Sequence, residues 1–99
     1  MKEIYYTPHL ELRLRLRSIN HNIPKRIYLE AQERYYDVAT QKLIAVKRLK
    51  YKEKVRELAV TYEERENEVR IITIHPLKEH QKVARLESGR WQKYEKRQK

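Results

Sequence analysis

The N-terminal part of the chain carries a hydrophobic pattern that two kinds of element explain. Apolar and polar residues alternate strictly within residues 7–19, TPHLELRLRLRSI, with a leucine at every second position from Leu10 to Leu16. Such alternation favours a half-buried strand. The capping residues favour a helix, because Thr7 is a good N-cap, Pro8 suits the first helical position, and the residues that follow are good helix formers. We predict a helix.

On this helix the leucines would occupy two sides, so we expect it to be wedged between two neighbouring elements. One side holds Leu10 and Leu14, and the other holds Leu12, Leu16 and Ile19. A second helix is predicted to begin at Pro24, after a short polar linker. The residues expected to line its inner side are Ile23, Ile27, Leu29, Ala31 and Tyr35.

From Tyr35 onward the pattern changes to that of an antiparallel sheet. A hairpin is predicted with its turn near residues 39–42, and three strands follow this turn, the first of which is the second strand of the hairpin. These are Leu43–Tyr51, Val55–Tyr62 and Val69–His75. The last of them, VRIITIH, is the most apolar stretch of the chain, and Pro76 ends it. We predict that it is the central strand, buried on both faces.

Residues 77–87 return to helical spacing, and Ser88-Gly89 fits a helix C-cap. A basic tail, RWQKYEKRQK, ends the chain. The expected fold class is therefore α+β, with two N-terminal helices packed on a four-stranded antiparallel sheet, then a C-terminal helix and the basic tail. We expect one domain over residues 1–99, with its core in residues 7–76 and the C-terminal helix and tail in residues 77–99.

The charge balance indicates acidic partners. The chain of 99 residues has 24 Lys and Arg against 14 Asp and Glu, a formal net charge of +10. Nucleic acid is the first candidate and an acidic protein the second. A charge-rich surface of a heat-adapted protein is the alternative, and the single glycine fits it, but surface ion networks need balanced signs. A role at a membrane surface is not expected, since no polybasic cluster accompanies a strong apolar face.

Cysteine usage and hydropathy exclude several classes. The sequence has no cysteine, which rules out disulfides and thiolate chemistry, and it has no long apolar run. We expect a cytoplasmic protein without a membrane span. His75 and His80 lack the spacing of a metal-binding helix, and the sequence has no phosphate-binding glycine loop, so neither metal nor cofactor is expected.

One stripe of side chains carries the most distinctive candidate chemistry. His9, Arg13 and Arg17 are four residues apart, so on a helix they lie on one side and place a proton-transfer group beside two permanent cations. This suits a polyanionic ligand. Each of the three also has an ordinary explanation, as a first-turn polar residue or as a solvated helix charge.

The order of elements resembles the RelE-like ribonuclease toxins, which pack two N-terminal helices on an antiparallel meander. His9, Arg13, Arg17 and Ile19, a Tyr-Asp hairpin and the strand VRIITIH resemble a family of small bacterial and archaeal proteins with such a first helix and an "IIT" strand. More loosely, Arg70, with the residues 71–74 that follow it, is similar to the last strand of the BrnT toxins. His75 stands where the BrnT pattern has arginine. The resemblance covers roughly residues 7–76.

This resemblance implies a metal-independent endoribonuclease, with cations to stabilise the phosphorane and groups that transfer protons. The candidate catalytic residues are His75, His9 and Arg70. The candidate RNA-binding residues are Arg13, Arg17, Arg48, Arg56, Lys50 and, as a base-stacking side chain, Trp91, with Tyr94 beside it in the tail. His75 has an ordinary explanation as the end of a strand, and a buried Arg70 would need a carboxylate, a carbonyl or a phosphate as partner.

The sequence is consistent with three functions. The first is an RNA-acting toxin-like protein that is held inactive by an acidic antitoxin and is expected to arrest growth when expressed alone. The second is a non-catalytic nucleic-acid-binding module, and the third is a structural protein. The expected partners are RNA and an acidic antitoxin protein, with a homodimer left open.

Overall fold

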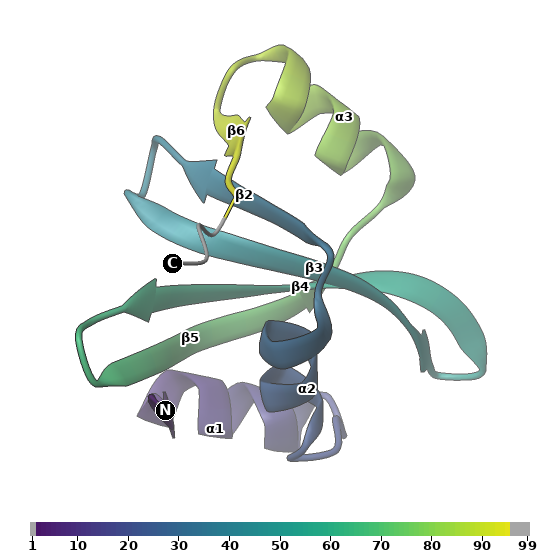
Figure 1. The fold of residues 1–99 in the computed structure, drawn as a ribbon. Coiled ribbons are helices and arrows are strands. Elements are labelled where there is room, and N and C mark those ends of the chain that lie inside the picture. Colours follow the sequence, from purple (N-terminus) through teal and green to yellow (C-terminus); the bar gives the residue numbers. More distant parts are fainter. Residues whose placement is uncertain (1, 96–99) are drawn as a thin grey trace.

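The chain folds around one mixed six-stranded sheet with three helices, within residues 2–95, which the computed structural model describes (Figure 1). The elements in chain order are β1 (Glu3–Tyr6), α1 (Pro8–Leu16), α2 (Ile23–Glu30), β2 (Glu33–Asp37), β3 (Lys42–Tyr51), β4 (Lys54–Glu64), β5 (Glu68–Pro76), α3 (Glu79–Glu87) and β6 (Trp91–Lys93). The fold is α+β, as predicted. The four predicted strands are present as β2 to β5, but the sheet has two more.

The additional strands lie at the two edges of the sheet, whose order is β1-β5-β4-β3-β2-β6. β1 pairs with the first half of β5 in parallel, and β6 pairs with β2 antiparallel. The prediction that β5 is the central strand is wrong, because β3 and β4 occupy the middle. Its burial on both faces is wrong as well, since Val69, Ile71 and Ile74 are buried while the residues between them are half-exposed.

The two faces of the sheet hold separate hydrophobic cores. α1 and α2 pack against one face, and α3 stands on the other side near β6 (Figure 1). The larger core, beneath α1 and α2, contains Leu10, Leu14, Ile27, Leu58, Val60, Tyr62, Ile71 and Ile74, among others. The smaller core, on the α3 side, contains Tyr35, Ile44, Val46, Ala59, Leu77 and Trp91.

The helix predicted over residues 7–19 is confirmed, and its start follows the expected chemistry. Thr7 is the N-cap, and its hydroxyl accepts a hydrogen bond from the Leu10 N–H at 3.2 Å. The predicted wedge is wrong. Leu10 and Leu14 are buried, but Leu12 is 46% and Leu16 75% exposed, so only one side of α1 meets the protein. Of the second predicted side, only Ile19 is buried.

The second helix begins one residue before Pro24 and ends at Glu30. Its predicted inner side is correct for Ile27, which is fully buried, and wrong for Leu29, which is exposed. Tyr35 lies in β2 and belongs to the smaller core, because its strand turns it to the α3 side.

The C-terminal helix α3 has no buried residue. Its predicted end is confirmed, since Ser88 caps it and Gly89 has a φ of +81°. Part of the predicted basic tail forms β6, and residues 96–99 of that tail lie outside the described residues. None of the helices in the described part of the chain has both the length and the apolar character needed to cross a membrane.

Candidate functional site

The stripe on α1 is present as the spacing predicted. The three residues follow one another at intervals of about one turn, and Arg13 Nη2 lies 3.5 Å from His9 Nε2. His9 is exposed, whereas Arg13 and Arg17 are half-buried, because they flank the side of the helix that carries Leu10 and Leu14.

Thr7 fixes how α1 lies against β5. The Thr7 N–H donates to the Ile71 carbonyl at 3.1 Å, and the Thr7 hydroxyl donates to the Ile72 carbonyl at 3.0 Å. β1 therefore ends where α1 begins, and α1 runs beside the second half of β5. This placement carries Arg13 and Arg17 toward the end of the strand that holds His75.

His75 points to the α3 side of the sheet. It pairs with Ala59 in the antiparallel register, and paired residues share a face. Ala59 belongs to the smaller core, so the imidazole leaves the sheet on that side. Burial lowers the pKa of His75 below its ordinary value, and the charges of Arg85, Arg13 and Arg17 lower it further.

The charges of three arginines thus contribute to the lowered pKa of one half-buried imidazole. Arg13 lies in α1 and Arg17 is the C-cap residue of α1, whereas Arg85 lies in α3, on the other side of the sheet. Near neutral pH the imidazole is neutral, so it can accept a proton, while the arginines supply permanent positive charge for an anion. We call this group, His75 with Arg13, Arg17 and Arg85, the His75 cluster.

Arg70 is not part of the His75 cluster. It lies five residues earlier on β5, roughly 16 Å away at the rise of an extended strand. Its Nη2 donates to Glu68 at 3.0 Å, and its guanidinium lies 5.4 Å from the ring centroid of Tyr5. The carboxylate partner that a buried Arg70 needs is therefore Glu68, and nothing in this placement supports the predicted catalytic role.

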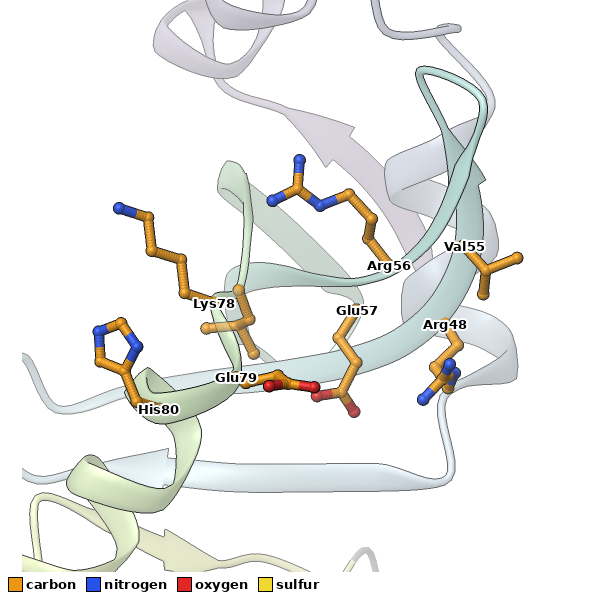
Figure 2. Close-up of a pocket in the computed structure, with 8 residues that line it drawn as sticks. Arg48, Val55, Arg56, Glu57, Lys78, Glu79 and His80 are labelled. Atoms are coloured by element: carbon orange, nitrogen blue, oxygen red, sulfur yellow. The ribbon is translucent and has the colours of Figure 1, made fainter.

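Arg48 and Arg56 line a different cleft, of about 430 Å³, between the β3–β4 hairpin and the start of α3 (Figure 2). Glu57 and Glu79 line it too, and Figure 2 shows Arg56 and Lys78 extending away from these two carboxylates. Arg48 and Arg56 therefore lie in a cleft to which Arg13, Arg17 and His75 do not contribute. Lys50, exposed on β3 farther along the hairpin, lies apart from the His75 cluster as well.

The prediction that Trp91 stacks on bases is wrong. Its side chain is 2% exposed, its ring stacks on Tyr35 at 5.4 Å between centroids, and Arg85 lies over it at 5.1 Å. The indole Nε1 donates to Asp37. Trp91 is a core residue of β6, because an amphipathic aromatic near a chain end fills the smaller core as readily as it binds a ligand. Tyr94, beside it, is half-exposed.

Sequence reasoning missed Arg85. Its helix has ordinary apolar spacing and many charges, so nothing local distinguishes this arginine from Lys82 or from any other basic residue of α3. Only the position of α3 above Trp91 brings Arg85 toward His75.

Polar contacts that the sequence did not reveal hold α3 and β6 in place. Lys82 Nζ bridges Glu33 at 2.9 Å and Glu57 at 2.8 Å. Burial raises the pKa of Tyr35, and its hydrogen bond to Glu33 raises it further, to about 12.

Asp37 is the buried carboxylate of this side, at 3% exposure. It accepts hydrogen bonds from Arg90, from the Ala39 N–H and from Trp91. Burial alone would raise its pKa, but these donors outweigh burial and hold the pKa of Asp37 below its ordinary value. Asp37 therefore ties the β2–β3 turn to the connection between α3 and β6.

Within residues 2–95, no group of three or more His, Asp or Glu side chains is arranged to hold a metal ion. Comparisons of the chain with protein-family models, with curated proteins and with solved structures gave no match.

Proposed function

We propose that the protein is an RNA-acting, toxin-like endoribonuclease that works without a metal ion, with the His75 cluster as its site. The observation that carries the proposal is a half-buried imidazole at the end of β5 whose pKa is lowered by burial and by the charges of three arginines. Support also comes from the net charge of +10, and from the resemblance of the helix-one stripe and the VRIITIH strand to RelE-like toxins.

In the proposed reaction, His75 takes the proton of a ribose 2′-hydroxyl. The 2′-oxygen then attacks the neighbouring phosphorus, and the bond from phosphorus to the 5′-oxygen of the next nucleotide breaks. The products are a 2′,3′-cyclic phosphate and a 5′-hydroxyl, which receives its proton from water or from His9. Arg13 and Arg17 stabilise the charge of the phosphorane, since a guanidinium binds phosphate oxygens in pairs.

Cleavage of labelled single-stranded RNA in the presence of a chelator tests this proposal. We expect cyclic-phosphate ends, and a loss of about 100-fold or more in rate for His75→Ala, because a positioned proton-transfer group contributes at least that much. His80→Ala is the matched control, since His80 is an exposed histidine that lines the separate cleft. Intact RNA with the folded wild-type chain, or an undiminished rate in His75→Ala, contradicts the proposal.

The arginines have a matched control on the same helix. Arg13→Ala is expected to slow cleavage by about 10-fold to 100-fold, in the range for removal of a charge that acts on the transition state. Arg15 lies on the same helix but is exposed and off the stripe, so Arg15→Ala is expected to leave the rate within about 3-fold. Equal losses in the two variants would mean that only overall charge matters.

Expression of the chain alone is expected to arrest growth, and His75→Ala is expected to relieve the arrest. The proposed neutralising partner is an acidic protein in the same cytoplasm. Leu12 and Leu16 are exposed on α1 beside Arg13 and Arg15, which suits an acidic amphipathic segment. If an acidic protein encoded beside this chain relieves the growth arrest, Leu16→Asp should weaken its binding and restore the growth arrest in its presence.

A non-catalytic nucleic-acid-binding module is the second candidate, favoured by the cations that lie outside the His75 cluster, such as Arg48 and Lys50. Both functions predict RNA affinity that falls steeply with salt. Cleaved product, in the same filter-binding samples, is expected only for the ribonuclease.

A further inference from the structure

The hairpin of β3 and β4 extends beyond the rest of the sheet. β2 pairs with β3 only as far as Val46, and the pairing of β5 with β4 ends at Leu58. Among the described strands, residues 47–56 therefore pair only within the β3–β4 hairpin. We call these ten residues the basic arm, and Figure 1 shows its tip projecting past the neighbouring strands.

The basic arm concentrates the positive charge of the protein. Its sequence, KRLKYKEKVR, holds six lysines and arginines and one glutamate, a net charge of +5, or half of the formal charge of the chain. In the described part of the protein, Lys47 is the one cation of the arm with an ion pair, to Glu30 at 3.5 Å. The other cations are therefore available to a ligand.

The cations lie on both faces of the arm and at its tip. Arg48 and Lys50 share the α3 side of β3, because they alternate with buried Leu49. Lys54 and Arg56 lie on the opposite face of β4. Leu49 belongs to the larger core and anchors the base, so the outer part, two residues on each strand and the two-residue turn, reaches about 10 Å.

The tip is a two-residue turn in which both residues have positive φ, 49° at Lys52 and 68° at Glu53. This is the type I′ geometry, whose twist matches the two strands and keeps the ribbon narrow. Asparagine and glycine are the usual residues there. In this chain the same positions carry two charged side chains at the end of the ribbon.

We propose that the basic arm binds double-stranded DNA by entering the major groove. That groove is about 12 Å wide and 8.5 Å deep, and it admits a two-stranded ribbon. Cations on both faces of the arm then meet the phosphates of both groove walls. Glu53, at the tip, reaches the groove floor, where the amino groups of cytosine and adenine are hydrogen-bond donors.

Two observations favour DNA duplexes over other nucleic acids. The major groove of duplex RNA is deep and too narrow for protein elements. Single strands are bound by aromatic rings on which bases stack, but the arm's single aromatic residue, Tyr51, packs against the larger core and has Lys52 Nζ 5.5 Å from its ring centroid.

Fluorescence anisotropy with a labelled DNA duplex of about 20 bp tests this proposal, with duplex RNA and single-stranded DNA of the same sequence alongside. At about 100 mM salt we expect affinity for duplex DNA at least about 10-fold above the other two, since groove entry adds contacts that they cannot supply. Similar affinity for all three nucleic acids would overturn the proposal.

The combined variant Lys50→Gln, Lys52→Gln and Lys54→Gln is expected to weaken duplex DNA binding at least about 10-fold. It should also reduce the slope of log affinity against log salt by about 2 to 3, since each phosphate contact contributes about 0.9. The matched control removes three exposed cations elsewhere, with Lys25→Gln, Arg65→Gln and Lys93→Gln, and is expected to cost less than about 3-fold. Equal losses in the two triple variants would overturn the proposal.

DNA binding by the basic arm can be tested independently of RNA cleavage at His75. His75→Ala is expected to leave duplex DNA affinity unchanged, because His75 pairs with Ala59 and lies in the sheet rather than in the arm. Loss of DNA binding in His75→Ala would contradict a site confined to the arm. A folded state with an unchanged unfolding midpoint confirms that the tip substitutions act through charge.

Discussion

The face of the sheet beneath α1 and α2 holds the larger hydrophobic core, whereas the face toward α3 holds the smaller core and a helix attached by charges and hydrogen bonds. On the first face, Leu10 and Ile27 are fully buried. On the second, α3 has no buried residue and is held by the Lys82 bridges and by Arg85 over Trp91. Stability therefore resides mainly on one face, and His75, the centre of the proposed site, points to the other.

The largest effect is expected from a core truncation on α1. Leu10→Ala should lower the free energy of unfolding by about 3 kcal/mol, because it removes a fully buried side chain and leaves a cavity. Leu12→Ala makes the same chemical change on the exposed side of the same helix and should cost less than about 0.5 kcal/mol. Urea unfolding of both variants measures the difference, and equal costs would contradict the one-sided packing of α1.

Asp37 provides the corresponding test on the α3 face. Asp37→Asn should cost about 2 kcal/mol, since a buried carboxylate would lose charged hydrogen bonds from Arg90. Because the folded pKa of Asp37 is below the unfolded value, its stabilisation is present above that unfolded value and is lost as the pH falls through the folded pKa. The variant should therefore show a shallower acid limb in thermal unfolding, whereas Glu66→Gln, at an exposed loop position, should match the wild type.

Lys82→Met should have a smaller global effect, of about 1 kcal/mol, because the ion pairs that it removes are partly exposed. Its local effect should be larger. Hydrogen exchange of the α3 amides is expected to accelerate by about 10-fold relative to those of α1. Lys25→Met, at an exposed lysine of α2, is the control. If α3 exchanges at an unchanged rate, the helix is held by contacts other than the Lys82 bridges.

The smallest effect is a pKa change at His75. Burial and the three arginines hold the pKa of His75 below its ordinary value, so Arg13→Ala should raise it toward that value, whereas Arg15→Ala should not. The folded state takes up this proton less readily than the unfolded state does. Stability is therefore complete above the unfolded pKa, about 6.5, and falls as the pH drops through the folded value. NMR titration of the imidazole measures both variants, and identical shifts would remove Arg13 from the cluster.

The elements that the sequence predicted correctly are those with local signals. Thr7 and Pro8 start α1, Gly89 follows the end of α3, and turn residues separate the strands of the meander. β1 and β6 were missed because they are four and three residues long, and their partners are distant in sequence. A strand of three or four residues is too short to show a recognisable alternation of apolar and polar residues.

The site was accessible to sequence reasoning only in part. Helical spacing correctly placed Arg13 and Arg17 on one stripe, but their approach to His75 depends on how α1 lies against β5, which is a tertiary property. The local sequence could not predict the role of Trp91. A basic segment with an aromatic residue is equally consistent with a ring that binds a ligand and with a ring that packs in the core, and only the burial of the side chain distinguishes the two.

Thr7 gives this architecture a single adjustment point. The Thr7 hydroxyl both caps α1 and binds the Ile72 carbonyl of β5. The stability of α1 and the position of Arg13 and Arg17 relative to β5 therefore depend on the same side chain. Thr7→Val keeps the shape of the side chain while removing both bonds. A substitution at Thr7 is therefore expected to change the position of Arg13 and Arg17 relative to His75 without altering any of these three side chains.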